Sequence, residues 1–241
     1  MKIVDKAVLV TGANRGIGQA LVEEALGRGA KRVYAGTRQP LTHPDERVTP
    51  LTLDTTDAAR IRAAVESVGS LDILVNNAGL GLYADLGDRA ALEQHLAVNL
   101  FGTYDTTQAF LPLLIRSRGA IVNVLSLAAL AAVPLDPTYS ISKAAAFSLT
   151  QSLRAALAGR GVSVYAALPG PVDTDMGPRI DIPKATPASV ARAILDGVEN
   201  GDEDIFPDPV SQPMAEGWRN SASKALERQF AALAAAEPIN S

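Results

Sequence analysis

Short runs of apolar, often β-branched residues alternate along the chain with longer segments in which apolar residues recur every three or four positions. Such runs predict buried strands, and the three-to-four spacing predicts helices. Strands without polar alternation are typical of a parallel sheet that is covered by helices on both faces. The sequence therefore predicts an α/β fold with a doubly wound parallel sheet.

The expected strands span residues 7–11, 31–36, 48–53, 71–76, 120–125, 162–168 and 204–206. The second expected helix should begin at a cap provided by Thr56 or Asp57. An apolar stripe predicts a last helix through Trp218, Ala222, Leu226, Phe230 and Leu233. The other expected helices span residues 17–28, 57–68, 89–112, 136–159 and 187–199.

No internal repeat, low-complexity tract or linker divides the 241 residues. Because α/β folds of about this length often form one domain, residues 1–241 are expected to form a single domain. The loop at residues 170–186 holds three prolines and two glycines. We expect this loop to be a mobile lid rather than a boundary between domains.

Charge and residue types exclude several classes of function. The formal net charge is −4, so we expect no binding to nucleic acid or to a membrane surface. The sequence has no cysteine, which excludes a disulfide framework, a thiolate nucleophile and a Cys-ligated metal. No segment approaches the roughly 18–20 apolar residues that span a bilayer. We therefore expect a cytoplasmic protein.

A glycine-rich turn lies between the first expected strand and the first expected helix. Residues 11–18 read TGANRGIG, with the glycines spaced G-x-x-x-G-x-G. Such glycines let backbone N–H groups approach a pyrophosphate at the helix N-terminus, although they also serve plain strand-to-helix turns. The context favours a dinucleotide-binding fold of the Rossmann type. The candidate phosphate-binding residues are Gly12, Asn14, Arg15, Gly16, Ile17 and Gly18.

The end of the second expected strand indicates which dinucleotide is preferred. An NAD-binding unit usually has an acidic residue about 20 positions beyond the glycines, bonded to the ribose 2′-hydroxyl. This sequence has Arg38 there, and Arg15 lies within the glycine turn. Two guanidinium groups suit a 2′-phosphate, so NADP(H) is expected to be preferred. The alternatives are two solvated surface arginines, or use of NAD(H) with Arg38 turned away from the ribose.

A tyrosine and a lysine form a candidate catalytic pair. Tyr139 and Lys143 are four positions apart, so they share one face of an expected helix. An ammonium group favours phenolate and lowers the pKa of a neighbouring phenol, so Tyr139 could exchange a proton with a carbonyl or alcohol oxygen. Ser126 follows the fifth expected strand, and its hydroxyl could bond the same oxygen. Taken singly, the three residues also fit a packed ring, a solvated amine and a turn.

Together these motifs resemble the short-chain dehydrogenase/reductase family, in its single-domain branch, over almost the whole chain. The resemblance implies a dinucleotide-binding oxidoreductase in which Lys143 also binds the nicotinamide ribose. It further implies that Asn99 holds a water near Lys143 and that Asp54 lies beside the adenine; a purely structural Asn99 and a helix-capping Asp54 stay open. The matching residues are the glycine turn, Asn76, Asn77, Ala78, Gly79, Asn99, Ser126, Tyr139 and Lys143, with Pro169, Gly170, Val172 and Thr174 as the turn that would receive the nicotinamide amide.

The segment near residues 170–187 is expected to shape the substrate site. Arg179 or Lys184 could hold a carboxylate, but neither is obviously placed to do so. The expected substrate is therefore a neutral, hydrophobic ketone, aldehyde or alcohol. The family resemblance implies a homodimer or homotetramer that packs through the helices at 89–112 and 136–159. The apolar candidates for the lining are Leu80, Leu82, Leu127, Val133, Met176 and Ile180.

Other classes of function fit the sequence less well. A nucleotide-binding regulator would not need a phenol beside an ammonium group, and a sugar-nucleotide epimerase would need a further substrate domain. His43 and His95 lack metal-ligand spacing, so no metal site is expected. The sequence thus favours an NADP(H)-dependent carbonyl reductase or alcohol dehydrogenase.

Overall fold

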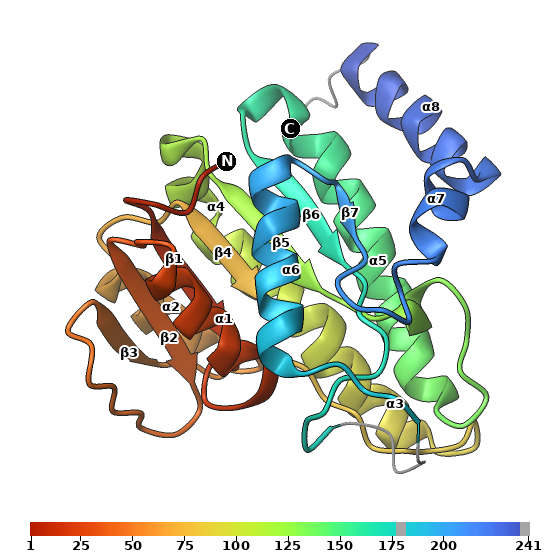
Figure 1. The fold of residues 1–241 in the computed structure, drawn as a ribbon, viewed down its shortest axis with the longest axis horizontal. Helices are drawn as coiled ribbons and strands as arrows, with labels where there is room; N and C mark the ends of the chain where they lie inside the picture. Colours follow the sequence, from red (N-terminus) through yellow and green to blue (C-terminus); the bar gives the residue numbers. More distant parts are fainter. Residues whose placement is uncertain (177–181, 237–241) are drawn as a thin grey trace.

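The structure, a computed structural model, describes residues 1–176 and 182–236, with side chains as far as residue 232. In this part of the chain, seven parallel strands form one sheet in the order β3-β2-β1-β4-β5-β6-β7 (Figure 1). The order runs outward from β1 in both directions, which confirms the predicted Rossmann-type, doubly wound sheet. The strands are β1 (Ala7–Thr11), β2 (Arg32–Thr37), β3 (Val48–Thr52), β4 (Ile73–Asn76), β5 (Ala120–Val124), β6 (Ser163–Ala167) and β7 (Asp204–Ile205).

The helices begin and end close to the predicted residues, except at two places described below. The α-helices are α1 (Gly16–Gly27), α2 (Ala58–Ser67), α3 (Arg89–Leu96), α4 (Thr103–Ser117), α5 (Pro137–Leu157), α6 (Pro187–Asn200), α7 (Met214–Arg219) and α8 (Ala222–Ala236). A π-helical turn joins α3 to α4 at Ala97–Gly102, and short 3₁₀ turns lie at Leu127–Ala129 and Ala158–Arg160.

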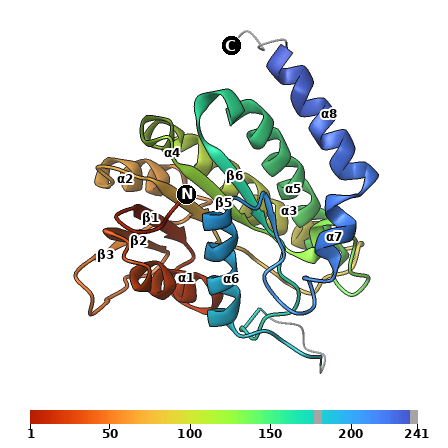
Figure 2. The same cartoon turned by 45° about the horizontal axis from the view of Figure 1, so that its top comes forward.

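Helices cover both faces of the sheet, as Figures 1 and 2 show. Alternate residues of a strand point to opposite faces. In β1, Val8 and Val10 pack with α1 and α6, whereas Leu9 packs with α2, α4 and α5. Each of these three side chains is at most 1% exposed. The continuous apolar pattern of the strand follows directly from burial on both faces.

The segment predicted as one helix over residues 89–112 is interrupted and extends further. The π-helical turn separates α3 from α4, and α4 continues past Pro112 to Ser117. A proline removes its own backbone donor from a helix and crowds the carbonyl of the preceding turn, but the buried side chains of Leu113 and Leu114 stabilise the turn that follows. The Gly102 backbone lies so close to the β3–α2 loop that a Cβ there would be 2.8 Å from Thr55 Oγ1.

The predicted last helix is two helices, because the chain turns at Asn220 and Ser221. Trp218 anchors the first of them: its ring lies edge-on to Phe147, with 5.5 Å between ring centres. Leu226 and Phe230 of α8 are 48% and 63% exposed. The predicted apolar stripe therefore does not turn towards the core at these two positions, and the Leu233 side chain lies outside the described part of the chain.

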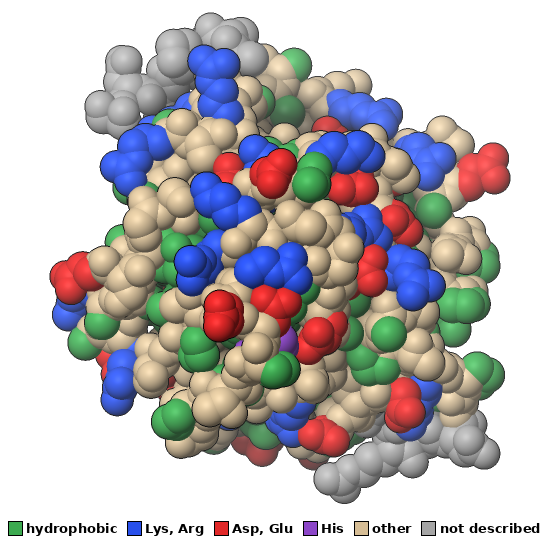
Figure 3. Space-filling view, turned by 60° about the vertical axis from the view of Figure 1, so that its left-hand side comes forward, with side chains coloured by type: hydrophobic (Ala, Val, Ile, Leu, Met, Phe, Trp, Pro, Cys, Tyr) green, Lys and Arg blue, Asp and Glu red, His purple; other side chains and the backbone are tan. Residues whose placement is uncertain are grey.

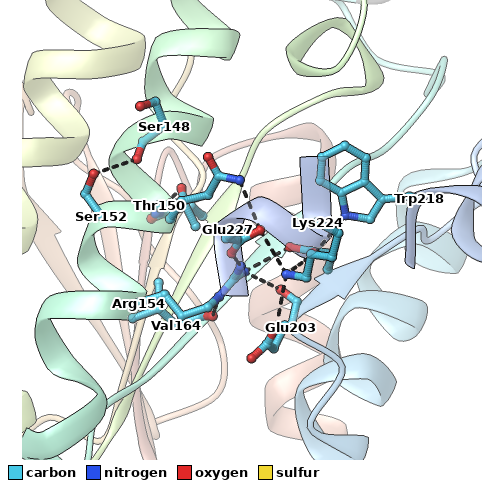
Figure 4. Close-up of polar contacts among 12 residues, drawn as sticks. Ser148, Thr150, Ser152, Arg154, Val164, Glu203, Trp218, Lys224 and Glu227 are labelled. Carbon is cyan, nitrogen blue, oxygen red and sulfur yellow. Dashed lines mark hydrogen bonds and ion pairs between the residues drawn. The ribbon is translucent and has the colours of Figure 1, made fainter. Parts of the chain in front are cut away.

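A buried cluster of charges holds α8 on the body of the protein instead (Figure 4). Lys224, which is 2% exposed, lies 2.7 Å from the Asp204 carboxylate and 3.1 Å from that of Glu227. Arg154 of α5 pairs with both carboxylates, and the Trp218 indole N–H donates to Asp204 at 2.9 Å. The polar face of α8 is therefore the face that packs inward.

Asp204→Asn should destabilise the protein, because it leaves Lys224 and Arg154 with one counter-charge fewer in a buried site. Removing one partner of a buried ion pair costs about 3–5 kcal/mol, which corresponds to a fall in Tm of roughly 6–20 °C for a chain of this size. Circular dichroism during heating measures the change. Glu93→Gln is the control, since it breaks the exposed Arg89–Glu93 pair and should leave Tm almost unchanged.

Charges of both signs are mixed on the surface. On the face shown in Figure 3, lysine and arginine side chains lie among aspartates and glutamates, and no large area carries one sign. Across the described residues, no helix combines the length and the apolar character needed to cross a bilayer.

Candidate active site

A cavity of about 1470 Å³ opens beyond the carboxyl ends of the strands. In an open α/β sheet, ligands bind at this edge, where the strand order reverses. The segments that follow β1, β2, β3, β4, β5 and β6 all contribute to its lining. Asn99, which is expected to hold a water near Lys143, does not line this cavity, whereas all the residues predicted to bind the cofactor or the substrate oxygen do. They are Gly12, Asn14, Arg15, Gly16, Ile17, Gly18, Arg38, Asp54, Asn77, Ala78, Gly79, Ser126, Tyr139, Lys143, Pro169, Gly170, Val172 and Thr174.

Three glycines shape the turn between β1 and α1. Gly12 and Gly16 have φ angles of 66° and 55°, a left-handed conformation that favours glycine. A Cβ at Gly18 would lie 2.1 Å from the Gly12 carbonyl oxygen, so a larger residue does not fit. Within the described chain, the Arg15 side chain makes no capping hydrogen bond to α1. The turn therefore offers backbone N–H groups at a helix N-terminus, which is a geometry suited to a phosphate.

The residues that follow β4 hold the glycine turn in position. Thr11 Oγ1 accepts hydrogen bonds from the N–H groups of Asn77 and Ala78, each at 3.0 Å. Asn77 Nδ2 donates to the carbonyl oxygens of Thr11 and Gly12 at 3.0 and 3.3 Å. The Asn77 side chain thus holds the glycine turn in shape, while the neighbouring backbone lines the cavity.

The two arginines predicted near a 2′-phosphate have different partners. Arg15 Nη1 lies 2.6 Å from Asp175 Oδ2, so this guanidinium pairs with the segment that follows β6 and lines the cavity. Arg38 is exposed after β2, and its positive charge acts on Asp54. Burial alone would raise the pKa of Asp54, but hydrogen bonds from Thr56 and the charges of Arg38 and Arg60 lower it.

Asp54 does not cap α2. Its carboxylate accepts hydrogen bonds from the N–H and the hydroxyl of Thr56, at 2.9 and 2.7 Å. The cap is Asp57, which accepts from the N–H groups of Ala59 and Arg60. The capping alternative for Asp54 is therefore wrong, and so is Thr56 as the cap of this helix, whereas Asp57 is confirmed as the cap.

Tyr139, Lys143 and Ser126 meet where α5 passes the end of β5. Asp136 begins the helix by accepting a hydrogen bond from the Tyr139 N–H at 3.4 Å. Lys143 Nζ lies 5.7 Å from the centre of the Tyr139 ring and donates to the Val124 carbonyl oxygen at 3.1 Å. Ser126 Oγ accepts from the Ala128 N–H at 3.1 Å. The helical spacing of four residues places the phenol and the ammonium group in one cavity.

Burial dominates the pKa values of this pair. Burial raises the pKa of Tyr139 to about 12; a hydrogen bond with Ser126 opposes the shift, and Asp136 and Tyr83 add to it. Burial lowers the pKa of Lys143 to about 8. The expected lowering of the Tyr139 pKa is therefore not observed in the structure. The cost of burying a phenolate outweighs the attraction of an ammonium group that lies 5.7 Å from the ring centre.

Asn99 lies in the π-helical turn, only 2% exposed and outside the cavity lining. Its Oδ1 accepts from the Leu80 N–H at 2.8 Å, and its Nδ2 donates to the Leu80 carbonyl and to Ser142 Oγ at 3.0 and 2.9 Å. The side-chain amide therefore holds the loop that follows β4 in a fixed position relative to α5. A Cβ at Gly79 would lie 3.4 Å from Asn99 Oδ1 and 3.7 Å from Lys143 Nζ, so Gly79 lies between the two.

His95 was given no role from the sequence, but it is fully buried beneath this site. The Leu82 N–H donates to its Nε2 at 3.1 Å, and its Nδ1 lies 3.1 Å from Thr138 Oγ1. Burial lowers the pKa of His95 and so favours the neutral ring. A neutral ring is required here, because only an unprotonated Nε2 can accept the hydrogen bond from the Leu82 N–H. Its ring is edge-on to Tyr139, with 5.9 Å between centres. His95 thus fixes the backbone of the segment after Gly79.

The outer part of the cavity matches the predicted substrate lining in part. Leu80, Leu127, Val133 and Met176 line it, whereas Leu82 lines a separate cleft of about 470 Å³. Lys184 is exposed and lies outside the lining of the large cavity. Ile180 and Arg179 lie outside the described residues.

Comparison with known proteins identifies the class of this site. The family model for the short chain dehydrogenases matches residues 6–184. The chain is 35% identical over 214 residues to an uncharacterised oxidoreductase of Staphylococcus saprophyticus, with 81% of this chain and 92% of that protein covered. It is 34% identical over 209 residues to 2-(S)-hydroxypropyl-CoM dehydrogenase 3 of Xanthobacter autotrophicus, with 80% and 82% covered. The protein belongs to the short-chain dehydrogenase family of oxidoreductases.

A solved relative extends this comparison to the structure. A short chain dehydrogenase from Burkholderia cenocepacia, in complex with NADP, superposes with a TM-score of 0.87 and 36% sequence identity. The alignment covers 95% of this chain and 98% of the relative. The similarity therefore extends across the carboxyl edge of the sheet, where the cavity lies.

Proposed function

We propose that this protein is an NADP(H)-dependent carbonyl reductase or alcohol dehydrogenase. The observation that carries the proposal is the meeting of a glycine turn with Ser126, Tyr139 and Lys143 in one cavity. A phosphate-binding turn alone would fit any nucleotide-binding protein. A phenol beside a buried ammonium group suits a reaction that moves a proton on and off an oxygen atom.

The residues of this chain would handle the proton and the developing charge on oxygen. The bound cofactor would supply hydride to the carbonyl carbon, or accept it from the alcohol in the reverse direction. Tyr139 would give its phenolic proton to the oxygen as the C–O double bond is reduced. The Ser126 hydroxyl would orient that oxygen and stabilise its negative charge. Lys143, with a pKa of about 8, would stabilise the phenolate and return a proton to it near neutral pH.

We propose a binding role for each part of the cavity. The glycine turn would hold the pyrophosphate, and Asp54 would lie beside the adenine. Arg38, with help from Arg15, would bind a 2′-phosphate, so NADP(H) would be preferred; NAD(H) is the alternative. Lys143 would bind the nicotinamide ribose, and Asn99 would hold the adjoining backbone and a nearby water. The turn that includes Pro169, Gly170, Val172 and Thr174 would receive the nicotinamide amide.

The substrate, the assembly and the location are proposed from the same features. Apolar side chains of Leu80, Leu127 and Met176 favour a neutral, hydrophobic ketone, aldehyde or alcohol. The segment near residues 170–187 would cover this substrate. We propose one domain over residues 1–241, a homodimer or homotetramer, and a location in the cytoplasm.

The rates of the two directions should depend differently on pH. Since the pKa of Tyr139 is about 12 and that of Lys143 about 8, the phenol and the ammonium group are both present below about pH 7, and kcat/KM for reduction should be nearly constant from about pH 5 to pH 7. Oxidation needs the phenolate, whose fraction rises about tenfold per pH unit below the pKa. We therefore expect kcat/KM for alcohol oxidation to rise with pH. Steady-state rates in both directions test this, and an oxidation rate that falls with rising pH would contradict it.

A titration of the purified protein with NADPH and with NADH, followed by addition of a panel of hydrophobic ketones, tests the proposal. Tighter binding of NADPH together with consumption of the reduced nicotinamide would support both the cofactor and the reaction. Failure to bind either dinucleotide would refute the proposed function. Binding of cofactor without turnover of any ketone or alcohol would favour a regulatory protein that retains the fold.

A further inference from the structure

A buried carboxylate lies behind the turn that is proposed to receive the nicotinamide. Asp208 follows β7 and is 1% exposed. It lies close to Gly170 although 38 positions separate them in the sequence. The Gly170 N–H donates to Asp208 Oδ2 at 2.7 Å, which is short for a hydrogen bond from a backbone amide. Asp208 does not line the cavity, so it can act on a ligand only through this turn.

The Asp208 side chain is itself held firmly. Its Oδ1 accepts from the N–H groups of Val210 and Ser211, both at 3.0 Å, and the Ser211 hydroxyl donates to Oδ2 at 2.8 Å. A carboxylate with four donors around it has little freedom to move. Asp208 therefore presents a fixed acceptor to the Gly170 backbone.

The same turn is also held from its other side, and it packs closely against Asp208 and Val210. The Pro169 carbonyl oxygen accepts from the Leu127 N–H at 2.9 Å, directly after Ser126. A Cβ at Gly170 would lie 2.9 Å from Asp208 Oδ1 and 3.1 Å from Val210 Cβ. The glycine thus allows the backbone to approach the carboxylate closely. The turn lies between the Ser126 end of β5 and the segment that follows β7.

We infer that Asp208 is a positioning residue for the nicotinamide end of the cofactor. By accepting the hydrogen bond from the Gly170 N–H, Asp208 fixes the position of the turn at residues 169–174 relative to Tyr139 and Ser126. Its side-chain hydrogen bonds join it to Gly170, Val210 and Ser211, so it can act on the glycine turn only indirectly, where Thr174 approaches Gly16. This inference rests on the proposed function, and it predicts a much larger effect on the nicotinamide half of the dinucleotide than on the adenine half.

The test compares two ligands on Asp208→Asn. NADPH contains the nicotinamide, whereas 2′-phospho-ADP-ribose contains only the part that the glycine turn and the arginines would hold. Asparagine keeps the size of the side chain but loses the charge and one acceptor oxygen, so the Gly170 N–H is held less well. Loss of a hydrogen bond to a charged acceptor weakens an interaction about tenfold or more. We expect Kd for NADPH to rise about tenfold and Kd for 2′-phospho-ADP-ribose to stay within about twofold of the wild-type value.

Two further variants separate positioning from general damage. Asp204→Asn removes another buried carboxylate from the same stretch of chain, and it should lower Tm without changing the ratio of the two Kd values. Ser211→Ala lies outside the cavity lining and removes the hydroxyl that donates to Asp208 Oδ2, so it should reproduce the selective loss of NADPH affinity in a weaker form. It therefore tests the same contact if Asp208→Asn does not fold.

The outcomes distinguish this inference from the proposed function. Equal weakening of both ligands, no weakening of either, or the same selectivity in Asp204→Asn would overturn the role of Asp208 while wild-type binding still supported the proposed function. Failure of the wild-type protein to bind either ligand would overturn the proposed function and, with it, this inference. Isothermal calorimetry below the unfolding temperature of each variant measures all of these constants.

Discussion

Tyr139→Phe should lower kcat for ketone reduction by on the order of 10²–10⁴-fold, the usual contribution of a positioned acid or base. The variant keeps the aromatic ring and therefore its edge-on contact with His95. It removes only the hydroxyl that would give its proton to the substrate oxygen. Because the proposed pyrophosphate contact lies elsewhere in the cavity and the Lys143 side chain is unchanged, Kd for NADPH should change by less than about threefold.

Tyr165→Phe is the matched control for this variant. Tyr165 is a buried tyrosine of β6 that packs in the core formed with α1 and α6, outside the cavity. Loss of its hydroxyl should leave kcat close to the wild-type value. Steady-state reduction of a ketone and fluorescence titration with NADPH measure both quantities. Near-normal turnover by Tyr139→Phe would refute the proposed acid–base mechanism.

Arg38→Asp should reverse the preference between the two dinucleotides. The substitution removes a guanidinium from the proposed 2′-phosphate site and places a carboxylate where it could accept a hydrogen bond from a ribose 2′-hydroxyl. A hydrogen bond between charged groups contributes about 1.5–3 kcal/mol, so Kd for NADPH should rise roughly 10- to 100-fold. Kd for NADH should fall or stay the same. Direct titration of both dinucleotides measures this ratio without reference to turnover.

Arg32→Asp makes the same change of charge at the opposite end of β2, where Arg32 bonds to Thr49. It should leave the ratio of the two Kd values unchanged. Arg15→Ala should raise Kd for NADPH less than Arg38→Asp does, because Arg15 is already engaged by Asp175. An unchanged preference in Arg38→Asp would show that the 2′-phosphate is not recognised at the end of β2.

The parts of this site that were predictable are those made by residues close together in the sequence. The glycine turn is a local feature, because strand, turn and helix follow one another within residues 7–18. The shared face of Tyr139 and Lys143 follows from the helical period alone. The cap of α2 was narrowed to Thr56 or Asp57 for the same reason, since the bonds of Asp57 reach only two and three residues ahead.

Other features depend on contacts that no local pattern encodes. The pairing of Arg15 with Asp175 joins residues 160 positions apart, and the sequence identified only the arginine. The pKa of Tyr139 differs from expectation because burial in the assembled cavity outweighs the neighbouring ammonium group. The inward-facing side of α8 was predicted wrongly for a similar reason. Lys224 and Glu227 face inward because Arg154 and Asp204, from distant parts of the chain, pair with them.

The sequence by itself determined the sheet, most of the helices and the residues that meet at the carboxyl edge of the sheet, because strand and helix periods and the parallel winding of the chain bring those residues there. Only the tertiary structure decided what surrounds them. It placed His95 under Tyr139, Asn99 against Leu80, and Asp208 behind Gly170. These contacts depend on packing between elements far apart in the chain, where the partner of a buried polar group is fixed by three-dimensional proximity rather than by spacing.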